Sequence, residues 1–98
     1  METEQPSPLG SLLLSARKRA NLTQEMLAER AAVSVNTISN LEAGRAHLPR
    51  QATLNLLVSA LASELALTPT EQASVRAAFR EATLATRVQR QGGAERSH

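Results

Sequence analysis

Apolar residues recur three and four positions apart near the start of the chain, and this spacing predicts a helix. The members of this first stripe are Leu9, Leu12, Leu13, Ala16 and Ala20. We expect a helix over about residues 9–20, with Pro8 in its first turn, where a missing backbone N–H is tolerated. Asn21 and Leu22 interrupt the stripe and end the helix.

Two short helices are expected next. Thr23 is a good N-cap for a helix over residues 24–31. Ser34 offers the same kind of start to a helix over residues 35–43. Gly44 ends that helix, because glycine adopts the left-handed conformation without a steric penalty. The side chains expected to face the core are Leu27, Ala28, Ala31, Val33, Ile38 and Leu41.

The second half of the chain predicts two further helices. A loop over residues 45–50 precedes a helix over about residues 51–62. Thr68 and Glu71 have the spacing of a capping box, and Pro69 occupies the first helical position, so a fifth helix begins there. The side chains expected to face the core in these two helices are Leu54, Leu57, Val58, Leu61, Val75, Ala78, Phe79 and Ala82.

The pattern indicates one all-α domain. A chain of 98 residues is long enough for a single core and too short for two. We expect residues 1–8 to be a disordered N-terminal segment and residues 9–88 to form the domain. The stripe of the fifth helix fades after about Ala85, and the polar residues 89–98 are expected to be a disordered tail.

Composition narrows the class of protein. Hydrophobic residues make up 42% of the chain and aromatic residues 1%, so the core must be almost entirely aliphatic, with Phe79 the lone ring. The absence of cysteine excludes disulfides, thiolate chemistry and cysteine-ligated zinc. Residues 1–8 lack the features of a signal peptide, and no apolar run has membrane-spanning length. We therefore expect a cytoplasmic protein.

The distribution of charge is more informative than its total. A formal net charge of +2 is too small to indicate nucleic-acid binding. Two stretches of the chain carry only positive charge, at Arg17, Lys18 and Arg19 and again at Arg45 and Arg50. If the two stretches share a face, that face is positive.

Two short helices that are separated by a turn and followed by a glycine have the spacing of a helix-turn-helix. The motif covers residues 23–44, with the sequence TQEMLAERAAVSVNTISNLEAG. This run resembles the Cro and phage-repressor-like (XRE) family, over roughly residues 9–67. The resemblance implies a five-helix, lambda-repressor-like DNA-binding domain in which the second and third helices form the motif. Ala32 departs from the family, many members of which place glycine here, and an alanine with positive φ costs about 1 kcal/mol.

The resemblance places the N-terminal part of the third helix in the major groove, so its exposed side chains are candidates for base recognition. These candidates are Val35, Asn36, Thr37 and Asn40. An asparagine amide pairs in a bidentate manner with adenine N6 and N7, and the methyl groups of valine and threonine suit the thymine methyl. The alternative is that these residues are ordinary solvated positions on a helix surface.

A second group of residues consists of candidates for contacts with the DNA backbone. The group is Gln24, Ser34, Arg45, Arg50, Lys18 and Arg19. Gln24 resembles the family glutamine that touches a phosphate, and Ser34 is placed to combine helix capping with a phosphate contact. Arg50 is also a candidate for the adjacent minor groove. The alternative for the arginines is that they are solvated charges.

Glu42 is a poor candidate for DNA contact, because a carboxylate repels phosphates. The resemblance implies instead an ion pair with Arg17 that ties the first helix to the third. His47 and His98 are isolated and lack the paired spacing of a metal site. No nucleophile, base and orienting group occur together, so we expect no enzymatic activity, no metal and no cofactor.

These observations favour a bacterial transcriptional regulator that binds a palindromic double-stranded DNA site as a dimer, because one recognition helix contacts only a few base pairs. Leu65 and Leu67, or the alanine-rich face from Ala77 to Ala85, are candidate dimer contacts. The alternative is a protein-interaction module, such as an antitoxin that binds a toxin, or the DNA-binding head of a larger regulator.

Overall fold

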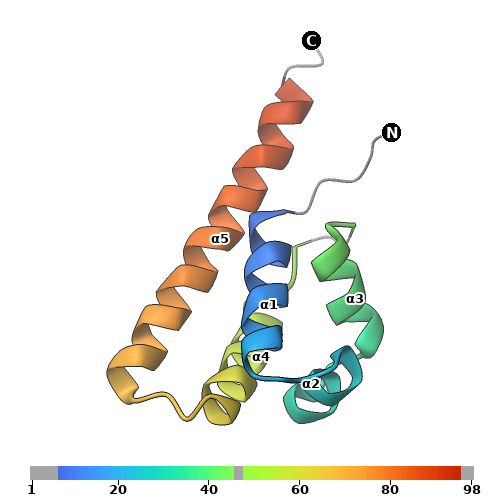
Figure 1. Ribbon diagram of the computed structural model, residues 1–98. Helices are drawn as coiled ribbons and strands as arrows, with labels where there is room; N and C mark the ends of the chain where they lie inside the picture. The colour runs from blue at the N-terminus through green and yellow to red at the C-terminus, as the bar shows by residue number, and fades with distance from the viewer. Residues whose placement is uncertain (1–6, 46–47, 96–98) are drawn as a thin grey trace.

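The computed structural model describes residues 7–45 and 48–95, which form five helices and no strand (Figure 1). The helices are α1 (Pro8–Arg19), α2 (Gln24–Ala31), α3 (Val35–Ala43), α4 (Gln51–Glu64) and α5 (Pro69–Glu95). The predicted all-α fold is confirmed. The predicted bounds of α2 and α3 match, and α4 ends two residues later than its predicted end at residue 62.

Side-chain caps fix where the helices begin. Thr23 Oγ1 accepts from the backbone N–H of Met26 (3.0 Å), as expected from its position before α2. Thr68 and Glu71 form the predicted capping box, in which each side chain accepts from the backbone N–H of the other residue (3.2 and 2.9 Å). Each cap satisfies an N–H group that the first turn of a helix leaves without a partner.

The N-terminal boundary of the domain differs from the prediction. Residues 1–8 were expected to be disordered, but Ser7 is buried and its hydroxyl accepts from the N–H of Gly10 (2.9 Å). Pro8 then begins α1. Ser7 is therefore the N-cap of α1, and its partner lies three residues on. Residues 1–6 lie outside the described residues.

The C-terminal boundary also differs. The backbone of α5 continues through residues 89–95, where a disordered tail was expected, and only residues 96–98 of that tail lie outside the described residues. Gly92 and Gly93 have low helix propensity, so propensity alone does not account for the longer helix. Adding residues to a helix that is already packed requires no new nucleation, and this favours the extension.

The core lies where all five helices meet. Its most deeply buried side chains are Leu9, Leu13, Leu27, Ile38, Leu57, Val58, Leu61 and Thr86. Ala78, which was expected to face inward, is exposed, and the inward face of α5 instead includes Thr83 and Thr86. Both threonine hydroxyls donate to the carbonyl four residues earlier (2.8 Å each), so they are buried without an unsatisfied donor. Thr86 also accepts from the N–H of Leu9 (3.0 Å), which joins α5 to the start of α1.

The turn between α2 and α3 contains the departure from the family pattern. Ala32 adopts a left-handed conformation, with φ of 59° and ψ of 41°, and its N–H caps the end of α2. The Ala32 side chain is exposed. Making this turn with alanine therefore costs about 1 kcal/mol of conformational free energy.

Helix α1 lies between α3 and α5 (Figure 1). It approaches α3 closely at Gly10, where an added Cβ would collide with the carbonyl oxygen of Leu41 and lie 3.2 Å from that of Glu42. Because the obstacle is backbone, a side chain here cannot be accommodated by a change of rotamer. The absence of a side chain at Gly10 therefore sets the separation of α1 and α3.

One hydrogen-bonded network joins α1, α2 and α3, with Arg17 and Glu42 at its centre. The Arg17 guanidinium forms a bidentate pair with the Glu42 carboxylate, with Nε–Oε2 and Nη2–Oε1 distances of 2.7 and 3.0 Å. Arg17 Nη1 donates to the carbonyl of Leu22 (2.8 Å), in the turn before α2. Gln24 Nε2 donates to Glu42 Oε1 (2.9 Å). The first residue of α2 is thus bonded to α3 through the carboxylate that holds α1.

The Arg17–Glu42 pair is shielded from water, since the two side chains are 12% and 6% exposed. Its hydrogen bond to Glu42 raises the pKa of the Arg17 guanidinium above the ordinary value of arginine, and burial opposes this rise. A raised pKa gives stability that is complete below the ordinary pKa and is lost only as the pH rises through the raised one. Arg17 therefore stays charged throughout the neutral range.

Gly10→Ala is expected to lower the free energy of unfolding by about 1 to 3 kcal/mol, because the new methyl group forces the backbones of α1 and α3 apart. Thermal unfolding followed by circular dichroism measures the change. Ser11→Ala, at an exposed position of the same helix, is the control and should be neutral or slightly stabilising. A stabilising effect of Gly10→Ala would show that the two helices are not in close contact at this residue.

Glu42→Ala is expected to cost about 2 to 4 kcal/mol, because it leaves the buried Arg17 guanidinium without its carboxylate. Glu64→Ala is the matched control: it breaks the Arg30–Glu64 pair (2.6 Å), whose side chains are 42% and 28% exposed, and should cost less than about 1 kcal/mol. Denaturant unfolding of both variants measures the difference, and equal losses would contradict the assigned role of Glu42.

Candidate nucleic-acid interface

Helix α3 lies at the edge of the molecule, with one face packed inward and the opposite face open (Figure 1). Ile38 and Leu41 are buried, and they anchor the helix to the core. Val35 and Asn36 are exposed in its first turn. The helical period of 3.6 residues then places Asn40 one turn after Asn36, on the same side.

A hollow of about 330 Å³ lies beside the outward face of α3, between that helix and the start of α4. Its lining residues are Asn36, Thr37, Asn40, Leu41, Leu48, Pro49, Arg50 and Thr53. We call this hollow the recognition groove. It brings together three of the four residues predicted to contact bases and Arg50, which was predicted to contact the backbone or the minor groove.

The polar side chains of the recognition groove differ in the hydrogen bonds that they make within the protein. The Asn36 amide makes no hydrogen bond to any other residue in the described part of the chain. Asn40 Oδ1 accepts from Arg45 Nη2 at 3.5 Å, a long contact that leaves its amide N–H groups available. Both amides therefore retain donors and acceptors for an external partner.

The start of α3 is fixed by Ser34. Its hydroxyl accepts from the backbone N–H of Thr37 (3.1 Å) and lies 2.9 Å from the Thr37 hydroxyl. Ser34 is thus a structural cap, as the sequence predicted, and its exposed hydroxyl is shared with one of the candidate contact residues. These contacts fix the conformation of the first turn of α3, which lines the recognition groove.

The remaining predicted residues lie outside the recognition groove. Gln24 is at the start of α2, and its side-chain N–H donates to Glu42, which leaves its side-chain carbonyl oxygen for another contact. Val35 is exposed beside the groove. Lys18 is exposed on the last turn of α1, and Arg19 lines a separate hollow between α1, α4 and α5.

The structure adds residues that sequence reasoning missed. Thr53, on the first turn of α4, lines the recognition groove together with Leu48 and Pro49. The sequence predicts little about Thr53, because its place in the groove depends on the orientation of α4 relative to α3. No local pattern encodes that orientation. The position of Thr53 three residues after Arg50 is the only hint in the sequence.

Within residues 7–45 and 48–95, no group of three or more histidine, cysteine or acidic side chains is arranged to hold a metal ion. His47 and His98, the two isolated histidines, lie outside the described residues. In the same part of the chain, no helix combines the length and the apolar character that crossing a membrane requires.

Comparison with models of protein families identifies the family of this chain. Comparison with curated proteins and with solved structures gave no significant match. The family model of the helix-turn-helix domain matches residues 8–73, which cover α1 to α4 and the first turn of α5. This match implies DNA as the partner, and the predicted resemblance to DNA-binding helix-turn-helix domains is confirmed. The chain belongs to the helix-turn-helix domain family.

Proposed function

We propose that this protein binds double-stranded DNA in a sequence-specific manner, with α3 in the major groove. The observation that carries the proposal is the recognition groove, in which Asn36, Thr37 and Asn40 face one hollow together with Arg50. Amides that retain free donors and acceptors suit adenine, and the methyl groups of Thr37 and Val35 suit thymine. The expected preference is therefore for sites that contain A·T base pairs at the positions these side chains reach.

The backbone contacts in this proposal come from the helix-turn-helix and from the loop that follows it. The start of α2 and the turn before α3 present Gln24 and Ser34 to one phosphate strand, and helix N-termini favour anions. Arg50 follows Pro49 and lines the recognition groove, where its charge suits a phosphate or the narrow minor groove. Arg45 donates to Asn40, which also lines this groove.

We further propose that two copies bind one palindromic site, because a single recognition helix contacts too few base pairs for high affinity. The half-sites would be about 34 to 36 Å apart. Val88 on α5 is 65% exposed, and its burial would favour association. Sedimentation of the chain with its DNA site tests this, since a single bound copy would contradict it.

In this proposal the protein is a cytoplasmic transcriptional regulator and not an enzyme. DNA binding is tested first by selection from randomised duplexes. An enriched sequence supports the proposal. Failure of the folded protein to retain any duplex at low salt would contradict it and favour the alternative, a module that binds another protein.

Asn36→Ala and Asn40→Ala are expected to relax base preference by about 1 to 3 kcal/mol at the positions they contact, with a smaller effect on binding to unrelated DNA. Competition between the selected duplex and single-base variants measures the preference. Gln89→Ala, an exposed amide on α5, is the matched control and should change nothing. Retained preference in both asparagine variants would remove them from the set of base-contacting residues.

Arg50→Ala is expected to weaken binding to all sequences by a similar factor and to reduce the slope of log affinity against log salt by about 1, since one phosphate contact is lost. Titrations at several salt concentrations measure the slope. An unchanged slope together with an altered base preference would show that Arg50 reads bases and does not contact the backbone.

A further inference from the structure

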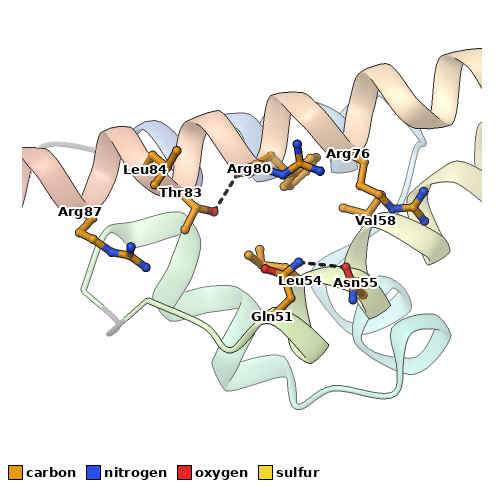
Figure 2. Close-up of a pocket in the computed structure, with 10 residues that line it drawn as sticks. Gln51, Leu54, Asn55, Val58, Arg76, Arg80, Thr83, Leu84 and Arg87 are labelled. Carbon is orange, nitrogen blue, oxygen red and sulfur yellow. Dashed lines mark hydrogen bonds between the residues drawn. The ribbon is translucent and has the colours of Figure 1, made fainter.

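A second hollow lies on the face formed by α4 and α5, and arginine side chains of α5 line one side of it (Figure 2). Its volume is about 220 Å³, and its lining includes Arg76, Arg80 and Arg87 of α5 and Gln51 and Asn55 of α4. We call it the arginine groove. The floor is formed by core residues such as Leu54 and Phe79, which are buried. The accessible lining therefore combines cationic and amide groups with apolar surface, which includes the half-exposed Leu84.

The three arginines form one stripe along α5. Helix geometry places their Cα atoms within about 40° of each other around the axis and spreads them over about 16 Å along it. Figure 2 shows Arg76 and Arg87 at opposite ends of the groove, with Arg80 between them. Such a row presents several positive charges to one extended anion.

These charges are not used within the fold. All three side chains are exposed, and none makes an ion pair or hydrogen bond with another described residue. No carboxylate lines the hollow. Arg17 and Arg30, by contrast, each pair with a glutamate. Like charges one turn apart destabilise a helix by a few tenths of a kcal/mol, so the fold gains nothing from this arrangement.

The start of α4 contributes residues to both the arginine groove and the recognition groove. Arg50 lines the recognition groove, and the next residue, Gln51, lines the arginine groove. Gln51 and Asn55 are hydrogen-bonded to each other (3.1 Å), which holds their amides side by side opposite the arginines. A DNA strand that contacts Arg50 would therefore continue toward these amides and the guanidinium groups of the arginine groove. Amides and guanidinium groups are common ligands of DNA phosphates.

We propose that the arginine groove binds backbone phosphates of the DNA segment adjoining the sequence that α3 contacts. This inference rests on the proposed DNA-binding function and extends the interface from the helix-turn-helix to α4 and α5. A second copy of this chain is a poor occupant, because its own groove would bring three further arginines. An amphipathic peptide is also disfavoured, because Leu84 is the only exposed large apolar side chain in the lining.

The test compares salt dependence on a selected duplex with long flanks. The triple variant R76Q/R80Q/R87Q should bind with a slope of log affinity against log salt that is shallower by about 2 to 3, and with at least about tenfold lower affinity near 0.1 M salt, as expected for the loss of two or three phosphate contacts. Base preference should stay as in the wild type. The triple variant with lysine at the same positions should recover most of the slope, since the charge is kept.

Arg30→Gln controls for the loss of one positive charge and should leave the slope unchanged, whereas Arg80→Gln should lower it by about 1. Circular dichroism verifies that each variant is folded. A wild-type slope in the glutamine triple variant would overturn the inference and leave the arginines as a solvated surface or a site for an acidic protein. Absence of DNA binding by the wild-type chain would overturn the proposed function itself, and the inference with it.

Discussion

The bidentate pair between Arg17 and Glu42 is the constraint on which the placement of the candidate interface depends. The Glu42 carboxylate accepts from Arg17 of α1 and from Gln24 of α2, and it lies on α3 itself. One buried charge therefore fixes two helices relative to the third. Since α3 contains only nine residues, it is too short to be stable alone, and its orientation must come from contacts of this kind.

The rest of the fold supports the same arrangement. Gly10 lets α1 approach the backbone of α3, and Thr86 holds the other side of α1 against α5 through the N–H of Leu9. Helix α1, which carries Arg17, is therefore held by α5 as well as by α3. On the outward face of α3, Asn40 accepts only a long contact from Arg45. The amide of Asn36 has no partner in the described part of the chain. Rigidity on one face and unused hydrogen-bonding capacity on the other are what base recognition requires.

Features encoded locally were predictable from the sequence. The caps at Thr23, Ser34 and Thr68 and the periodicity of α2 and α3 gave correct helix starts, because each depends on residues within one or two turns. Features that depend on contacts between residues far apart in the sequence were not predictable. The burial of Thr86 and the close approach at Gly10 are set by how helices pack. The composition of the recognition groove, with Thr53 beside Asn40, likewise requires the relative orientation of α3 and α4.

A double-mutant cycle between Arg17 and Glu42 tests most directly whether this pair holds the motif together. Unfolding free energies of Arg17→Ala, Glu42→Ala and the double variant give the coupling energy of the two side chains. A coupling of about 2 kcal/mol or more is expected, because each single variant leaves a largely buried charge without its counter-charge while the double variant removes both charges. A coupling near zero would show that α3 is held in place by its apolar contacts alone.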